Sequence, residues 1–185
     1  MTVDADHVAD DLESVLLTEE QILARVGELA AEIGKDMTGR EIILIGVLGG
    51  AATFTVDLAR ALETPVEIGW MAIRSYTTAG NRASGSVRLL KDLDIDIAGR
   101  DVIIAETVIQ TGLTMSWLIS NLNQRRPASI AVCTLLRKPD APRLAVPAYN
   151  GFDVPAGQIV GYGLDYHGRY RNLRCAAVLA PHAVR

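Results

Sequence analysis

The stretch DVIIAETVIQTGLT at residues 101–114 decides the fold class of this chain. Residues 101–105 are a strong candidate for a buried strand, because three β-branched residues follow one another from Val102. The run continues through residues 106–110 into the dipeptide Thr111-Gly112, and a helical stretch begins at Leu113. A strand that enters a turn and then a helix is a building unit of parallel sheets covered by helices.

The same order recurs elsewhere along the chain. Residues 41–47 form a second β-rich run, followed by Leu48-Gly49-Gly50 and a helical stretch over residues 51–62. Thr18 and Gln21 form a capping-box pattern that predicts the start of a further helix. Other predicted strands cover residues 65–73, 87–90, 130–136, 159–161 and 175–179. The alternation predicts an α/β fold with a doubly wound parallel sheet, whose ligands bind at the carboxyl ends of the strands.

Three segments lack such patterns. Residues 1–14 are acidic and are predicted to be a mobile tail, which leaves residues 15–185 as a single domain. Residues 75–86 are small and polar and are predicted to form a mobile surface loop. Residues 137–147 contain three prolines and are predicted to be a connector.

Composition excludes several classes of protein. The 185 residues are 49% apolar and carry a formal charge of −4 without a long basic run, so nucleic acid is not an expected partner. The longest apolar stretch, residues 42–56, is interrupted by three glycines and is too short to span a membrane. Cys133 and Cys175 lie in apolar runs and are predicted to be buried thiols. With no signal-peptide pattern, a cytoplasmic protein is expected.

The turn after the strand at residues 101–105 offers a site for phosphate. Thr111, Gly112, Leu113 and Thr114 bring hydroxyl groups and backbone N–H groups to a predicted helix N-terminus, an arrangement that binds anions. An alternative is purely structural, with Thr111 capping the helix and Gly112 easing the turn.

This turn resembles the phosphoribosyl-pyrophosphate loop of type I phosphoribosyltransferases, in which two acids, two apolar residues and a third acid precede Thr-Gly-x-Thr. Other segments resemble bacterial hypoxanthine-guanine phosphoribosyltransferases. They are VRLLKDLD (87–94), CTLLRKP (133–139), GFDVP (151–155), VGYGLDY (160–166), RYRNL (169–173) and VLAP (178–181). The resemblance implies a small hood with a flexible loop beside the sheet, and a homodimer or homotetramer. It implies transfer of ribose 5-phosphate from phosphoribosyl pyrophosphate to a purine-like base, with Mg²⁺.

The resemblance also implies roles for individual residues. The implied catalytic residues are Glu106, at the ribose hydroxyls, and Gln110, at the imidazole side of the base. The implied phosphate-binding residues are Thr107, Thr111, Gly112, Leu113 and Thr114. Those at the pyrophosphate are Gly49, Gly50 and Arg171. Those at the base are Lys138, Gln158, Ile159 and Asp165, and Asp165 also helps to hold Mg²⁺. The hood loop begins at Arg74, Ser75 and Tyr76.

Five of these positions depart from the family pattern. Thr107 and Gln110 replace the second and third acids of the loop, and a carboxamide cannot act as a general acid or base near neutral pH. Gly49 replaces a lysine, Arg74 a small residue, and Gln158 an aromatic residue that stacks on the purine. The changes coincide with ligand-contacting positions, which indicates a retained fold with an altered ligand or chemistry.

Three functions are therefore open. One is transfer to a purine or a modified purine, which needs no acid at Gln110 if the base differs on its imidazole side. Another is a different enzyme on the same scaffold, with another 5-phosphate ligand. The third is a non-catalytic protein that binds a nucleotide or a partner subunit.

Overall fold

The computed structural model describes residues 5–78 and 81–184. Its main sheet has six strands in the order β4-β3-β2-β5-β6-β7. These strands are β2 (Ile42–Leu48), β3 (Val66–Thr78), β4 (Asn81–Lys91), β5 (Asp101–Ile109), β6 (Ser129–Arg137) and β7 (Ala148–Asp153). All neighbours pair in parallel except β4, which is antiparallel to β3. The predicted α/β fold with a parallel sheet is confirmed.

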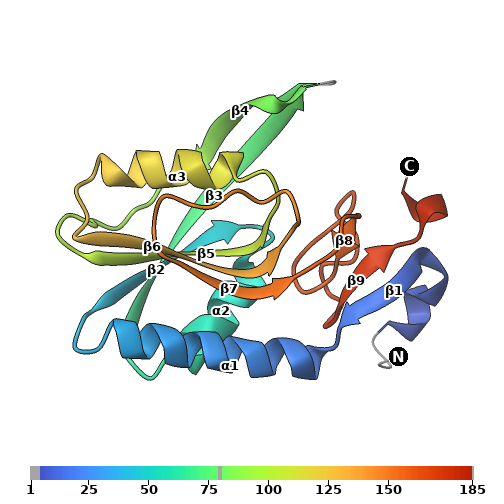
Figure 1. The fold of residues 1–185 in the computed structure, drawn as a ribbon, viewed down its shortest axis with the longest axis horizontal. Helices are drawn as coiled ribbons and strands as arrows, with labels where there is room; N and C mark the ends of the chain where they lie inside the picture. Colours follow the sequence, from blue (N-terminus) through green and yellow to red (C-terminus); the bar gives the residue numbers. More distant parts are fainter. Residues whose placement is uncertain (1–4, 79–80, 185) are drawn as a thin grey trace.

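Helices cover both faces of this sheet. Helices α1 (Glu19–Asp36) and α2 (Ala52–Ala61) lie on one face, and α3 (Leu113–Asn123) lies on the other (Figure 1). The predicted capping box is present, because Thr18 Oγ1 accepts from the Gln21 N–H while the Gln21 side chain accepts from the Thr18 N–H. Among the described residues, no helix combines the length and apolar character that a membrane span requires.

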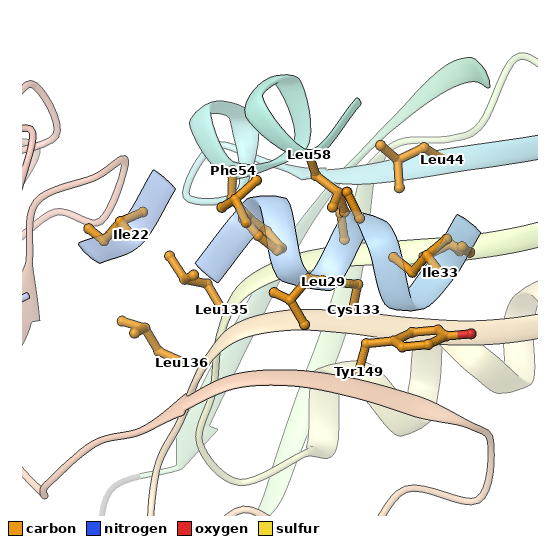
Figure 2. Close-up of a cluster of buried hydrophobic side chains, with 14 of the residues drawn as sticks. Ile22, Leu29, Ile33, Leu44, Phe54, Leu58, Cys133, Leu135, Leu136 and Tyr149 are labelled. Atoms are coloured by element: carbon orange, nitrogen blue, oxygen red, sulfur yellow. The ribbon is translucent and has the colours of Figure 1, made fainter. Parts of the chain in front are cut away.

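The strands are apolar on both faces because both faces are covered. Ile42 and Leu44 of β2 belong to the core beneath α1 and α2, whereas Ile43 and Ile45 belong to the core beneath α3. Figure 2 shows the first core, where side chains from α1, α2 and the strands meet. The residues labelled there are Ile22, Leu29, Ile33, Leu44, Phe54, Leu58, Cys133, Leu135, Leu136 and Tyr149. Cys133 and Cys175 are both buried, as predicted.

A second sheet stands beside the first and has the order β1-β9-β8. It consists of β1 (Leu12–Leu17), β8 (Ile159–Val160) and β9 (Ala176–Leu179), preceded by the 3-10 helix η1 (Asp6–Asp11). The predicted mobile tail is therefore wrong for residues 6–14; residues 1–4 lie outside the described residues. The physical reason is long-range pairing, because β1 pairs antiparallel with β9 near the other end of the chain.

The predicted surface loop at residues 75–86 is also wrong. Strand β3 continues to Thr78 and pairs with β4, so that Ser75 lies opposite Val87 and Tyr76 opposite Ser86. Backbone pairing in a long hairpin thus overrides the polar composition; residues 79–80 lie outside the described residues. Residues 138–147 contain no helix or strand, which agrees with the predicted connector, but β7 directly after them has no counterpart in the sequence prediction.

Candidate active site

The strand order creates a switch point between β2 and β5. From β2 the chain moves outward through α2 to β3, whereas from β5 it moves in the opposite direction through α3 to β6. The loops that follow β2 and β5 therefore diverge to opposite faces of the sheet at its carboxyl edge. Ligands bind at such a point in doubly wound sheets, and the loops at residues 48–51 and 110–112 lie there.

The loop after β2 is held close to the neighbouring elements. The peptide bond between Leu48 and Gly49 is cis. The Gly50 carbonyl accepts a hydrogen bond of 3.0 Å from the Thr107 hydroxyl on β5. A Cβ placed on Gly49 would lie 3.9 Å from Cζ of Arg171. The guanidinium group of Arg171 thus lies next to the position from which a side chain at residue 49 would project.

The loop after β5 begins α3 without a side-chain cap. Gly112 is the N-cap residue and adopts a left-handed conformation with φ 67°. A Cβ there would also overlap the Pro142 ring, so glycine is required for both conformation and space. Thr111 is exposed beside this helix N-terminus. Uncapped N–H groups and a flanking hydroxyl form a cradle for an anion.

The turn at residues 161–171 supplies two charged side chains. Asp165 Oδ1 lies 2.6 Å from Nη2 of Arg171. The other carboxylate oxygen accepts from the Gly168 N–H at 2.8 Å, and Nη1 of Arg171 donates to the Gly163 carbonyl at 2.6 Å. Both side chains are partly exposed, at 29% for Asp165 and 44% for Arg171, so they are ordered and still accessible to a ligand.

A pocket of about 260 Å³ joins these elements. Its lining residues are Gly50, Val108, Gln110, Lys138, Gln158, Ile159, Leu164, Asp165 and Arg171. Nζ of Lys138 donates to the Gly157 carbonyl at 2.6 Å, and burial lowers the pKa of its ammonium group. A larger hollow of about 710 Å³ lies along the connector, and none of the predicted site residues is among the described residues that line it. The smaller pocket is the candidate site because it lies at the switch point.

Residues 14–167 match the family model of the phosphoribosyl transferase domain. The chain belongs to the phosphoribosyltransferase family. It is 53% identical over 184 residues to the hypoxanthine-guanine phosphoribosyltransferase of Mycobacterium tuberculosis (strain ATCC 25618 / H37Rv), across 96% of this chain and 91% of the relative. The Bacillus subtilis (strain 168) enzyme of that name is 42% identical over 174 residues, covering 92% of this chain and 95% of its own.

Solved phosphoribosyltransferase structures agree with the fold. The crystal structure of a hypoxanthine phosphoribosyltransferase from Staphylococcus aureus has a TM-score of 0.90 at 35% sequence identity. The match covers 97% of this chain and 98% of that one. The predicted fold and family resemblance are thereby confirmed.

The pocket brings together most residues predicted to touch the base, the metal and the pyrophosphate. Seven of the residues predicted for a phosphoribosyltransferase site line it: Gly50, Gln110, Lys138, Gln158, Ile159, Asp165 and Arg171. Gly49 lies beside Arg171, which lines the pocket. The predicted phosphate-binding residues 111–114 directly follow Gln110 in the sequence. Arg74 is an exposed residue of β3, while Ser75 and Tyr76 continue that strand.

Thr107 does not fit its predicted role at the phosphate. Its side chain is fully buried and its hydroxyl group donates to Gly50, so no surface of it is available to a ligand. The reason is the alternation of a strand: Glu106, Val108 and Gln110 retain some exposure, whereas Thr107 and Ile109 are buried.

Two apolar residues of the pocket wall, Val108 and Leu164, were not predicted from the sequence. The same alternation was a signal for Val108, because residues 106, 108 and 110 share one face of β5. Leu164 had only a weak signal, its place directly before Asp165 in the motif VGYGLDY.

Glu106 is the acid of β5, and its environment shifts its ionisation. Burial raises the pKa of its carboxyl group to about 7, against the opposing effect of hydrogen bonds from the backbone N–H groups of Thr107 and Val108. Oε1 accepts from the Thr107 N–H at 2.9 Å. Near neutral pH this group therefore exchanges between charged and neutral forms.

The raised pKa of Glu106 predicts a pH-dependent stability. Folding favours the protonated carboxyl group, because burial penalises the charged form. The contribution of Glu106 to the free energy of unfolding is therefore fully present below the ordinary pKa of 4.5 and is lost as pH rises through about 7. Its upper limit is about 3 kcal/mol, and partial exposure reduces it. We expect Glu106→Gln to flatten the decline of unfolding free energy between pH 5 and 8, as measured by urea denaturation. Glu63→Gln, at an exposed carboxylate, is the control; parallel profiles for E106Q and the unmodified protein would contradict the assignment.

Proposed function

We propose that this protein transfers ribose 5-phosphate from phosphoribosyl pyrophosphate to a purine base. The observation that carries the proposal is the pocket at the switch point, which places Lys138 and the strand residue Ile159 together with Asp165 and Arg171. The identity of about half of all residues with named hypoxanthine-guanine phosphoribosyltransferases, over nearly the whole chain, supports it.

The N-terminus of α3 is suited to the 5-phosphate. Its uncapped N–H groups and the helix dipole favour a dianion, and the hydroxyls of Thr111 and Thr114 supply further donors. Gly112 adopts the left-handed conformation with which this helix begins. These contacts fix the ribose end of the substrate relative to the pocket.

The pyrophosphate belongs at the opposite side, beside Gly49 and Arg171. Gly49 has no side chain, and the guanidinium group of Arg171 lies beside the position where a cationic side chain at residue 49 would begin. A guanidinium group binds phosphate oxygens in a bidentate manner. Leaving-group stabilisation would therefore depend on Arg171 in this chain.

Magnesium fits this site in one way. Among residues 5–78 and 81–184, no three acidic, histidine or cysteine side chains gather closely enough to hold a metal ion. Among the described residues that line the pocket, Asp165 alone presents a carboxylate, and Mg²⁺ is commonly held by one carboxylate with substrate phosphates and water. Asp165 would hold the ion only together with the pyrophosphate, whose charge the ion neutralises.

The base belongs between Lys138, Gln158 and Ile159. The ammonium group of Lys138 can donate to an exocyclic oxygen, and the backbone of Ile159 can pair with the edge of the purine ring. Gln158 is exposed and offers hydrogen bonds but no aromatic face. The transfer forms a bond between a ring nitrogen and C1′, breaks the bond from C1′ to the pyrophosphate oxygen, and releases a proton from the base. Gln110 cannot accept that proton, so it passes to solvent.

A second candidate is nucleotide binding without turnover. Two observations favour it: Thr107 is buried and Gln110 is a carboxamide, so the described residues of the pocket contain one carboxylate, Asp165, and it is paired with Arg171. Such a protein would still bind a 5-phosphate at α3.

A homodimer or homotetramer, expected from the resemblance, remains a prediction that light scattering can test.

The test is a transfer assay. Hypoxanthine or guanine is supplied with phosphoribosyl pyrophosphate and Mg²⁺, and the release of pyrophosphate is measured. We expect turnover that requires the base, and a loss of at least about tenfold in Asp165→Asn because a weaker metal ligand holds the pyrophosphate less well. Binding of inosine monophosphate without turnover would favour the second candidate. Asp140→Asn, outside the pocket, is the matched control and is expected to retain full activity.

A further inference from the structure

We infer that Thr107 is a positioning residue whose hydroxyl fixes the loop at residues 48–50 in the shape that receives pyrophosphate. The binding of pyrophosphate by this loop rests on the proposed function. The stabilisation of the loop by Thr107 does not depend on it. The residue acts through Gly50 and touches no substrate, which distinguishes this role from the ligand contact expected of the family position.

The contact between Thr107 and Gly50 joins two neighbouring strands at their carboxyl ends. Strands β2 and β5 pair in parallel, with Gly46 opposite Ala105, so Thr107 lies level with the beginning of the loop after β2. Its hydroxyl group donates to the Gly50 carbonyl at 3.0 Å and is fully buried. The bond as a whole is part-buried, because Gly50 retains some exposure, and the loss of such a bond costs about 1 kcal/mol.

The Gly50 carbonyl is also where the turn at residues 161–171 meets the loop. A Cβ on Gly163 would overlap the Gly50 oxygen, so the two backbones are in direct contact there. The Gly163 carbonyl in turn accepts from Arg171, and the Arg171 guanidinium group lies beside Gly49. Moving Gly50 would therefore displace both the loop and the arginine that faces the pyrophosphate.

The chemistry of the side chain suits this role. Threonine offers a donor to Gly50 while it adds no charge to a fully buried position. Aspartate at this position would lack a proton for the Gly50 carbonyl at neutral pH, and burying its charge would be unfavourable. Threonine at residue 107 is therefore suited to be an internal support of the loop.

The first test measures the loop in the ligand-free protein. Thr107→Val preserves the shape of the side chain and removes the donor, whereas Thr107→Ser keeps a hydroxyl. We expect hydrogen exchange of the peptide spanning residues 48–54 to accelerate about fivefold in T107V, in line with one lost hydrogen bond, and to recover in T107S. The matched control is Thr134→Val, since Thr134 is a buried threonine of β6 that donates to the Leu136 carbonyl. Equal exchange at residues 48–54 in T107V and T134V would overturn the inference.

The second test measures ligands by calorimetry. We expect T107V to weaken phosphoribosyl pyrophosphate about tenfold and inosine monophosphate, which lacks a pyrophosphate, less than twofold, with T134V unchanged for both. Equal weakening of both ligands, or of neither, would overturn the inference. If the unmodified protein binds neither ligand, the proposed function fails, while the exchange experiment still decides whether Thr107 holds the loop.

Discussion

Replacing Gln110 by aspartate is expected to raise kcat for purine transfer by about 100-fold, at the low end of the contribution of a positioned acid or base. Gln110 lines the pocket and is exposed, so an aspartate there stays hydrated and adopts its ordinary ionisation. The carboxylate would accept the proton that the base releases as its ring nitrogen bonds to C1′. The measurement is steady-state turnover with hypoxanthine and guanine over a range of pH.

Gln110→Asn is the matched control, because asparagine has the shape of aspartate without an ionisable group. We expect Q110N to remain near the activity of the unmodified protein and to lack the acidic limb that Q110D introduces into the pH profile. Similar rates for Q110D and Q110N would show that residue 110 takes no part in proton transfer. The result would then favour a base whose chemistry needs no acid at this position.

Gly163→Ala is expected to lower the free energy of unfolding by about 2–5 kcal/mol, the sum of a left-handed alanine and an overpacked contact. Gly163 has φ 90°, and a Cβ there overlaps the Gly50 carbonyl oxygen. Backbone rather than a flexible side chain must therefore move. Because Gly50 lines the pocket, phosphoribosyl pyrophosphate should also bind at least about tenfold more weakly.

Gly39→Ala separates the cost of the left-handed conformation from the cost of the contact with Gly50. Gly39 has a comparable φ of 74°, but no atom of the described residues lies within 4 Å of a Cβ placed there. It precedes β2 and so lies at the end of the sheet opposite the pocket. We expect G39A to lose about 1–2 kcal/mol and to bind ligand normally, as measured by urea denaturation and calorimetry. Equal losses in G163A and G39A would mean that the contact with Gly50 adds nothing.

Local sequence predicted the elements whose stability is local. The capping box at Thr18, the buried run from Val102 and the glycine at residue 112 each act within a few residues, and the structure has all three. The family motifs placed Lys138, Asp165 and Arg171 in one site, and they line one pocket. Uninterrupted apolar runs also predicted strands of the parallel sheet, because strands that are buried on both faces are apolar at successive residues.

Polar or acidic segments that become strands only by pairing with another strand had no such signal. The acidic composition before Leu17 predicted a tail, but β9 pairs with this segment. The polar composition of the hairpin predicted a loop, but β3 and β4 pair there. Backbone groups of polar segments pair as well as those of apolar ones, whether the partner strand is distant, as β9 is for β1, or adjacent, as β4 is for β3. Composition therefore misled at both places.

By itself, the sequence determined that this chain is an α/β protein of the phosphoribosyltransferase family, and it predicted a phosphate site at the N-terminus of α3. Only the tertiary structure decided what Thr107 does. Its residue type suggested a weakened ligand contact, whereas the packing of β5 against the loop after β2 directs its hydroxyl to Gly50. A side chain's type limits the bonds that it can make, but the backbone groups within its reach are set by strands that the chain brings together only on folding.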